Sequence, residues 1–241
     1  MKYKALLLLL LISSLGYAQK NVVTAGIQFK PMLPNDLFNA DEMRTSNSGM
    51  NFETQQNFGW GGGMVIRWGF TEMLSLETGI NYVRRNYSLS IDSIDNNYSG
   101  STEYRIDGYE VPIMGLIYIR LDRKWYMNAA LGGSIDLFPR DFYSDTINAD
   151  WIHETGRRSW IQVAMLANIG FEYRTESSGY FYIGGSFHRP FSYMYLSKIG
   201  LGDNPFTETS MTIDGSYLTI DLRYFFHDDP VKREKRKKNR N

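Results

Sequence analysis

The stretch Ser216-Tyr-Leu-Thr-Ile-Asp-Leu-Arg-Tyr-Phe-Phe226 decides the fold, because its apolar and polar residues alternate along a strand. One face would carry Leu218, Ile220, Leu222, Tyr224 and Phe226; the other would carry Tyr217, Thr219, Asp221, Arg223 and Phe225. A period of two over about ten residues matches one tilted crossing of a bilayer by a β-strand. The stretch ends in three aromatic residues, as expected at a membrane–water interface. It therefore predicts the closing strand of a membrane β-barrel.

Seven further strands are indicated upstream by the same alternation. They cover residues 22–29, 58–68, 74–85, 104–120, 125–137, 160–174 and 180–191. Long polar stretches at 31–56, 92–101, 138–156 and 197–214 are expected to be loops, whereas 69–73, 121–124 and 175–179 are short turns. Alternating long and short connections are typical of outer-membrane barrels. The chain is thus predicted to be all-β, an eight-stranded antiparallel up-and-down transmembrane β-barrel.

The composition of the 241 residues is compatible with this prediction. The formal net charge is zero and mean hydropathy is −0.36, which looks soluble. Only alternate residues of a barrel strand meet lipid, so a low mean hydropathy does not exclude the membrane. Because the chain has no cysteine, disulfides and thiolate metal sites are excluded. No EF-hand spacing occurs, and we expect no metal and no cofactor.

Both ends of the chain differ from the barrel. Lys2 and Lys4 precede an apolar run at 5–12 and small residues up to Ala18, the pattern of a secretory signal peptide over 1–18. The barrel is expected over 19–226. A basic periplasmic tail follows over 227–241, expected to be disordered or to contact an anionic partner. The tail contact would be made by Lys232, Arg233, Lys235, Arg236, Lys237, Lys238 and Arg240.

A secreted, lipocalin-like barrel is the soluble alternative, since alternation alone does not say which face meets lipid. Two features favour the membrane. The polar face is rich in small residues that suit a narrow interior, and aromatic residues gather near strand ends like two interface girdles. These aromatic residues are Trp60, Trp68, Tyr82, Trp125, Trp160, Tyr173, Tyr224, Phe225 and Phe226.

The polar faces carry charges of both signs, which we expect to line the lumen. They are Arg67, Glu77, Arg85, Glu110, Arg120, Asp136, Glu172, Arg174, Asp221 and Arg223. In a barrel of eight strands the interior is just wide enough for side chains, so these charges should pair. A side-chain-filled, rigid lumen is the favoured interpretation, and an ion or small-solute pathway is the alternative.

Catalytic chemistry finds little support in the sequence. Among three histidines, His188 could pair with a serine as in a membrane acyltransferase or lipase, but no motif surrounds it. We expect a lumen histidine, no catalytic residue and no enzyme activity. Nucleic-acid binding is not expected of an exported chain.

With the strands placed, the chain resembles the outer-membrane β-barrel family common in Bacteroidetes, including the PorT-like group. The resemblance covers roughly residues 22–226 and is carried by Leu74-Ser-Leu-Glu-Thr-Gly-Ile-Asn-Tyr-Val-Arg-Arg85, Tyr109-Glu-Val-Pro-Ile113 and the closing strand. It implies the bacterial outer membrane, and for some members a role in type IX protein secretion and gliding. Many outer-membrane barrels end at an aromatic residue, whereas in this chain the basic tail follows Phe226.

The expected function is therefore that of an outer-membrane barrel with a structural or interaction role. Its partners would be outer-membrane lipid and lipopolysaccharide, the barrel insertion machinery, and a periplasmic or secretion-complex protein. The alternatives are an accessory barrel of a type IX secretion or gliding complex, and a small-solute channel.

Overall fold

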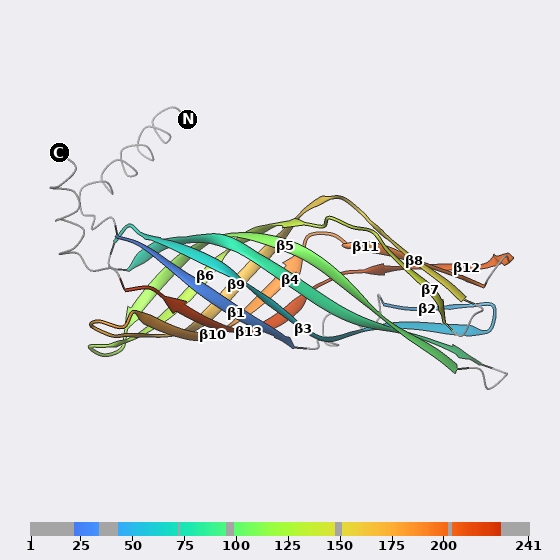
Figure 1. Ribbon diagram of the computed structural model, residues 1–241, viewed down its shortest axis with the longest axis horizontal. Helices are drawn as coiled ribbons and strands as arrows, with labels where there is room; N and C mark the ends of the chain where they lie inside the picture. Colours follow the sequence, from blue (N-terminus) through green and yellow to red (C-terminus); the bar gives the residue numbers. More distant parts are fainter. Residues whose placement is uncertain are drawn as a thin grey trace, which may run out of the picture.

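The computed structural model describes residues 22–33, 43–71, 73–94, 99–147, 151–201 and 204–227. The elements of these residues are all strands, thirteen of them (Figure 1). They are β1 (Val22–Leu33), β2 (Arg44–Asn47), β3 (Met50–Gly69), β4 (Leu74–Ser93), β5 (Ser99–Arg120), β6 (Trp125–Leu137), β7 (Phe142–Ile147), β8 (Trp151–Arg157), β9 (Ile161–Arg174), β10 (Tyr180–Pro190), β11 (Tyr195–Leu201), β12 (Asn204–Ile213) and β13 (Tyr217–Phe225). None of the described residues forms a helix long and apolar enough to cross a membrane.

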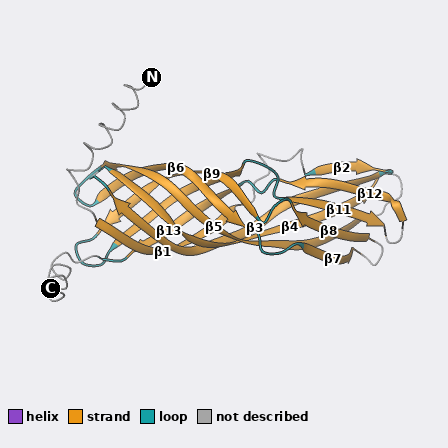
Figure 2. Cartoon of the chain, turned by 90° about the horizontal axis from the view of Figure 1, so that it is seen from above, coloured by secondary structure: helices purple, strands orange, loops and turns teal. Residues whose placement is uncertain are grey.

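The larger sheet has nine antiparallel strands in the order β1-β13-β10-β9-β6-β5-β4-β3-β2. Strand β1 also pairs with β3, so the sheet curves round into a ring (Figures 1 and 2). Gly26 of β1, for example, lies opposite Phe225 on one side and Val65 on the other. The predicted all-β antiparallel ring is confirmed, and the strand predicted at 125–137 coincides with β6.

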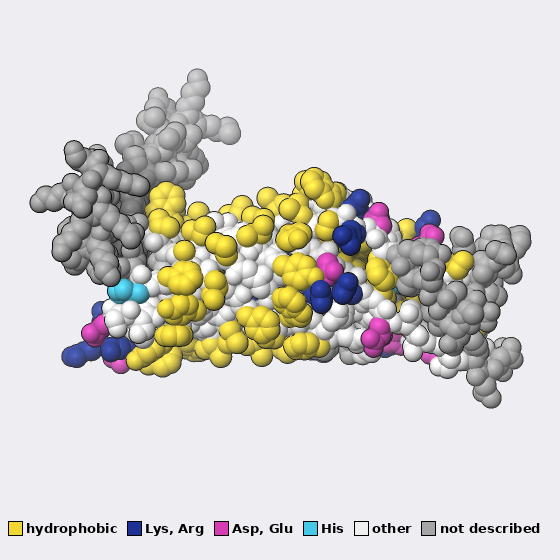
Figure 3. Space-filling model, in the orientation of Figure 1, with side chains coloured by type: hydrophobic (Ala, Val, Ile, Leu, Met, Phe, Trp, Pro, Cys, Tyr) yellow, Lys and Arg dark blue, Asp and Glu magenta, His cyan; other side chains and the backbone are white. Residues whose placement is uncertain are grey.

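The outside of the ring is apolar, because every second residue of its strands points outward and most of these residues are hydrophobic. Ile27, Met64, Ile117, Ile169 and Ile183 each expose half or more of their surface. Hydrophobic side chains form a broad belt over the ring, and charged side chains begin where the belt ends (Figure 3). Such a belt is unfavourable in water and favourable in lipid.

Two rows of aromatic rings border the belt. At one end, Phe29, Trp60, Tyr82 and Tyr109 follow one another on adjacent strands, with successive ring centroids 6.3, 5.4 and 6.0 Å apart. At the other end, contacts join Trp68 to Phe70, Trp125 to Tyr173, Phe181 to Tyr224, and Tyr224 to Phe226. Phe225 is a correction to the expected girdles: it is fully buried and points inward, as its place in the alternation requires.

Three strands are far longer than the membrane needs. Strands β3, β4 and β5 have 20, 20 and 22 residues, whereas β6 has 13 and β13 has 9. At about 3.3 Å per residue, 20 residues span about 66 Å, roughly twice the hydrocarbon thickness of a bilayer. The far ends of these strands therefore project beyond the belt, at the end opposite the short turns (Figure 2).

The projecting ends join a second sheet of four strands, β12-β11-β8-β7. We call the far ends of β3–β5, strand β2 and this second sheet the extension. Strand β12 lies beside β2, and β7 beside β5, so both edges of the second sheet adjoin the projecting part of the larger sheet. The loops expected at 31–56, 138–156 and 197–214 are corrected here. The first contains β2 and the first seven residues of β3, the second contains β7 and most of β8, and the third contains most of β11 and all of β12. The loop expected at 92–101 shrinks to the gap between β4 and β5.

A β-bulge marks the border between ring and extension. The pairing of β3 with β4 shifts by one residue between Asn57 and Trp60, opposite Arg85. Before the bulge Phe52 and Thr54 point inward, and after it Val65 and Arg67 do. The even-numbered residues of β3 therefore face the interior before the bulge, and the odd-numbered residues face it afterwards. The pairing of β5 with β4 stops around Pro112, which has no N–H to donate, and resumes in the same register.

The extension has its own apolar core. Phe52 packs edge-on against Trp151 with ring centroids 5.5 Å apart, and Tyr87 stacks on Tyr104 at 5.4 Å. The interior of the extension is thus mainly apolar, whereas the interior of the ring combines charged and polar side chains with a smaller apolar cluster. The buried residues of this extension core are Met43, Phe52, Tyr87, Leu89, Ile91, Tyr104, Ile106, Phe138, Trp151, Met194, Tyr195, Ile199, Met211 and Ile213.

Candidate functional site

The interior of the ring is where the sequence-predicted charges come together. Nine of the ten expected side chains point inward, and Lys30 of β1 joins them. We call the inward-facing charges the lumen network: Lys30, Arg67, Arg85, Arg174 and Arg223, with Glu77, Glu110, Asp136, Glu172 and Asp221. Five positive and five negative groups balance, as low-dielectric surroundings require.

Toward the short turns, carboxylates bridge arginines from different strands. Glu172 of β9 accepts hydrogen bonds from Arg67 of β3 and Arg174, both at 2.6 Å. Glu77 of β4 binds Arg67 at 3.1 Å and Arg223 of β13 at 2.5 Å. Each carboxylate therefore ties together two cations, and the bond from Arg67 to Glu172 crosses the interior of the ring, whereas Arg67 and Glu77 are partners on neighbouring strands.

Asp221 extends this network along β13 and β10. It binds Arg223 at 2.6 Å and accepts bonds from Ser186 at 2.5 Å, Thr219 at 2.6 Å and Asn168 at 3.0 Å. Hydroxyl and amide donors thus satisfy a carboxylate that is completely buried.

Toward the extension, Glu110 is the centre of a second group. It accepts bonds from Tyr217 at 2.6 Å and Asn81 at 2.9 Å, and it pairs with Lys30 at 3.4 Å. His188 stacks on Tyr217 with ring centroids 4.4 Å apart. The histidine Nε2 lies 2.8 Å from Asp136 and 3.9 Å from Glu110.

Arg85 lies beyond this group, directly below the extension core. It is 1% exposed, and its guanidinium lies over the rings of Tyr217 at 5.0 Å and Phe138 at 5.5 Å. Its Nε has no hydrogen-bond partner among the described residues. Contacts with aromatic faces partly replace the hydration of this cation.

Arg120 does not belong to the lumen network, and its expected position is wrong. It is exposed at the last residue of β5, and its Nε donates to the Asp122 carbonyl at 3.2 Å. The strand ends there, so alternation no longer fixes the side-chain direction. The tail residues 232–240 lie outside the described residues, as does the signal segment at 1–18.

Glu110, Asp136 and His188 have the donor types of a metal site, with one atom from each within 4.8 Å of the others. The surrounding bonds argue for another role. Lys30 neutralises Glu110, and Ser134 and His188 already bind Asp136, at 2.8 Å each. We therefore assign Glu110 and Asp136 to the lumen network and treat His188 as the hydrogen-bond partner of Asp136.

Sequence reasoning missed the parts played by Lys30 and Tyr217. Lys30 lay just past the predicted end of the first strand, although it continues the inward series of Thr24, Gly26 and Gln28. Tyr217 was placed on the inward face, but its bond to Glu110 joins strands far apart in sequence. Such contacts depend on the tilt and closure of the ring.

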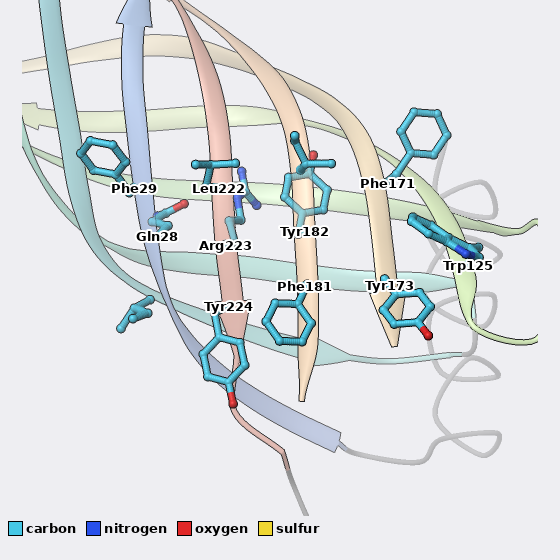
Figure 4. A pocket seen from close by; sticks show the side chains of 12 residues that line it. Gln28, Phe29, Trp125, Phe171, Tyr173, Phe181, Tyr182, Leu222, Arg223 and Tyr224 are labelled. Carbon is cyan, nitrogen blue, oxygen red and sulfur yellow. The ribbon is translucent and has the colours of Figure 1, made fainter. Parts of the chain in front are cut away.

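An apolar groove of about 480 Å³ lies on the outside of the ring near the short turns, across β1, β13, β10, β9 and β6. Phe29, Leu222, Tyr224, Phe181 and Phe171 line its wall (Figure 4). Because its lining belongs to the belt, this groove has the character of a contact for acyl chains.

Comparison with known proteins identifies the fold. No family model matches the chain, and no curated protein matches it. The crystal structure of the outer membrane protein OprG from Pseudomonas aeruginosa matches with a TM-score of 0.50 and 12% sequence identity, over 86% of this chain and 95% of that one. The fold is thus that of an outer-membrane β-barrel protein. Together with the apolar belt, it indicates localisation in the bacterial outer membrane.

Proposed function

We propose that this chain is an eight-stranded, closed, up-and-down barrel with a structural or interaction role in the bacterial outer membrane. The eight strands would be β1, β3, β4, β5, β6, β9, β10 and β13, each bonded to two neighbours. Short turns of outer-membrane barrels face the periplasm. The extension would then stand outside the cell, available to other molecules.

The lumen network is the observation that carries this proposal. Arg67 joins β3 to β9, and Tyr217 joins β13 to β5, so charged and polar side chains bridge the interior. The extension core then follows in line with the ring. A solute would have to break buried ion pairs and cross an apolar core, which argues against a channel.

Conductance in planar lipid bilayers tests the filled lumen. The folded full-length protein is expected to give no steady openings at moderate voltage. The double variant Glu77→Ala with Arg67→Ala should leave a wider interior and raise the frequency of openings. Steady conductance of the unmodified protein would overturn the proposal in favour of a small-solute channel.

A subunit of a secretion or gliding complex is the second candidate, supported by the resemblance to the PorT-like group and the basic tail. Gentle detergent purification from native outer membrane, with and without residues 228–241, tests it. Proteins that co-purify with the full chain and vanish with the tail would support a complex subunit. A barrel that purifies alone in both forms would support a stand-alone surface protein.

We propose no enzymatic activity. His188 is bonded to Asp136 and stacked on Tyr217, which explains its burial without catalysis. Any lipid-acyl hydrolysis or transfer by the purified protein should be unchanged by His188→Gln. An activity lost in that variant, with the barrel still folded, would contradict the proposal.

A further inference from the structure

Two arginines stand at the border between the apolar belt and the extension, beside β9 and β10. Arg189 belongs to the outward series of β10 and lies opposite Met165 of β9. Phe191, 73% exposed, follows it at the end of the strand. Arg158 precedes β9, and its backbone N donates to the Met194 carbonyl at 2.9 Å.

Backbone bonds place the two segments side by side. The Phe191 N donates to the Val163 carbonyl at 3.1 Å. The guanidinium of Arg158 lies over the ring of Tyr193, with its Cζ 5.0 Å from the ring centroid. Tyr193 lines two hollows, one of about 670 Å³ with Arg189 and one of about 370 Å³ with Arg158. We call Arg158, Arg189, Phe191 and Tyr193 the arginine rim.

Arg158 and Arg189 are both exposed, and neither forms a salt bridge with a residue that the structure describes, whereas the neighbouring Arg157 pairs with Asp141 at 3.4 Å. Each hollow also has one acid in its lining, Asp214 beside Arg189 and Glu154 beside Arg158. Burial raises the pKa of Asp214, whereas a bond from the Ser216 hydroxyl and the charge of Arg189 lower it. An arginine next to lipid is best satisfied by an anion at the level of the headgroups, and its planar fork suits phosphate oxygens.

We propose that the arginine rim binds the phosphate of a phosphorylated glycolipid of the outer leaflet, of the lipid A class. Arg158 and Arg189 hold the headgroup phosphate on either side of Tyr193. Phe191 and the belt residues below it, Val163 and Met165, contact the acyl chains. This inference rests on the proposed orientation, in which the extension lies outside the cell.

Binding of diphosphorylated lipid A to the full chain in detergent micelles tests the proposal, read by native mass spectrometry and by titration. We expect Arg158→Gln with Arg189→Gln to weaken binding by about tenfold or more. Arg120→Gln, at the exposed short-turn end, is the matched control and should bind like the unmodified chain. Lipid A without phosphates should bind the unmodified chain as weakly as the double variant binds diphosphorylated lipid A.

Equal binding by the double variant and the unmodified chain would overturn the proposal. Competition by inorganic phosphate at concentrations equal to those of lipid A would also overturn it, in favour of a free-anion site. The heat-dependent gel shift of the folded barrel is measured in parallel for every variant. If all variants show the gel shift but the double variant binds lipid A like the unmodified chain, the proposed role of the arginine rim is refuted and the barrel is not. If the unmodified chain shows no gel shift, the proposed barrel is refuted.

Discussion

At the residue scale, buried charge is the feature that most needs a physical account. Glu77 and Glu172 each neutralise two arginines, so the lumen network shares its partners and is not a set of isolated pairs. Removing Glu77 takes one of two carboxylate partners from Arg67, which keeps Glu172, and one from Arg223, which keeps Asp221. The buried network is then left with an excess positive charge in a low-dielectric interior. The loss of one partner of a buried pair is much more destabilising than the replacement of the whole pair.

The substitution Glu77→Gln should therefore lower the free energy of unfolding by about 3 kcal/mol. Urea titration of the barrel refolded in liposomes, followed by tryptophan fluorescence, measures the change. Glu176→Gln is the control, since this side chain is 89% exposed and its pair with Lys124 is long at 3.6 Å. Equal stability of the two variants would contradict a tightly coupled lumen network.

His153 should make the extension sensitive to acid. It is fully buried beside Tyr104, its Nε2 lies 2.8 Å from the Ser197 hydroxyl, and burial lowers its pKa from 6.5 to about 4. The unfolded state therefore binds the proton first as the pH falls. The stability that neutral His153 provides is complete above about pH 6.5 and is lost as the pH falls toward about 4.

Hydrogen exchange of β8 and β11, measured between pH 7 and pH 4 with correction for intrinsic rates, checks this expectation. Protection should decrease through that window in the unmodified chain and change less in His153→Gln. His227→Gln, which alters an exposed histidine, should behave like the unmodified chain. A pH profile that is identical in all three proteins would contradict the role of His153.

At the element scale, the sequence predicted the strands of the ring and missed the extension. Strict alternation identified β6 to the residue and placed Asp221 and Arg223 on the inward face of β13. The strands of the extension were not predicted because the buried positions on this part of β3 include Thr54 and Gln56, polar residues that are common in loops. The bulge at 57–60 then shifts the inward-facing positions by one residue, so the apolar–polar alternation does not run unbroken through β3.

Gly59 should be essential to this bulge. A Cβ at this position would lie 2.4 Å from the backbone oxygen of Arg84, which cannot move without breaking the ladder. Gly59→Ala should lower the free energy of unfolding by about 1–3 kcal/mol. Gly115→Ala is the matched control, because its Cβ would meet only the Leu131 oxygen at 3.8 Å. Equal urea midpoints for the two variants would show that the bulge tolerates a side chain.

At the scale of the whole molecule, the proposed closure of the ring rests on the pairing of the first strand, β1, with the last, β13. Ile27 and Tyr224 are direct partners on the outside of the ring. Antiparallel partners have Cα atoms about 4.5–5.5 Å apart, within the range that a disulfide spans. The chain has no native cysteine, so engineered cysteines report this closure without interference.

Ile27→Cys with Tyr224→Cys should form a disulfide in the refolded barrel under mild oxidation, seen as a mobility change that reductant reverses. Ile27→Cys with Phe181→Cys is the control, because β13 lies between these strands and separates the sites by about 10 Å. Efficient cross-linking of the control pair, or none of the first pair, would refute the closed ring.

The second sheet has a further consequence that follows from the order of its strands. Strands β7 and β8 form one hairpin between β6 and β9, and β11 and β12 form another between β10 and β13. Each hairpin leaves the ring and returns to the neighbouring ring strand, so it can be exchanged as a cassette without altering ring register. The pairing of β6 with β9 and of β10 with β13 holds the ring register, so the four-stranded sheet can change without a change in that register.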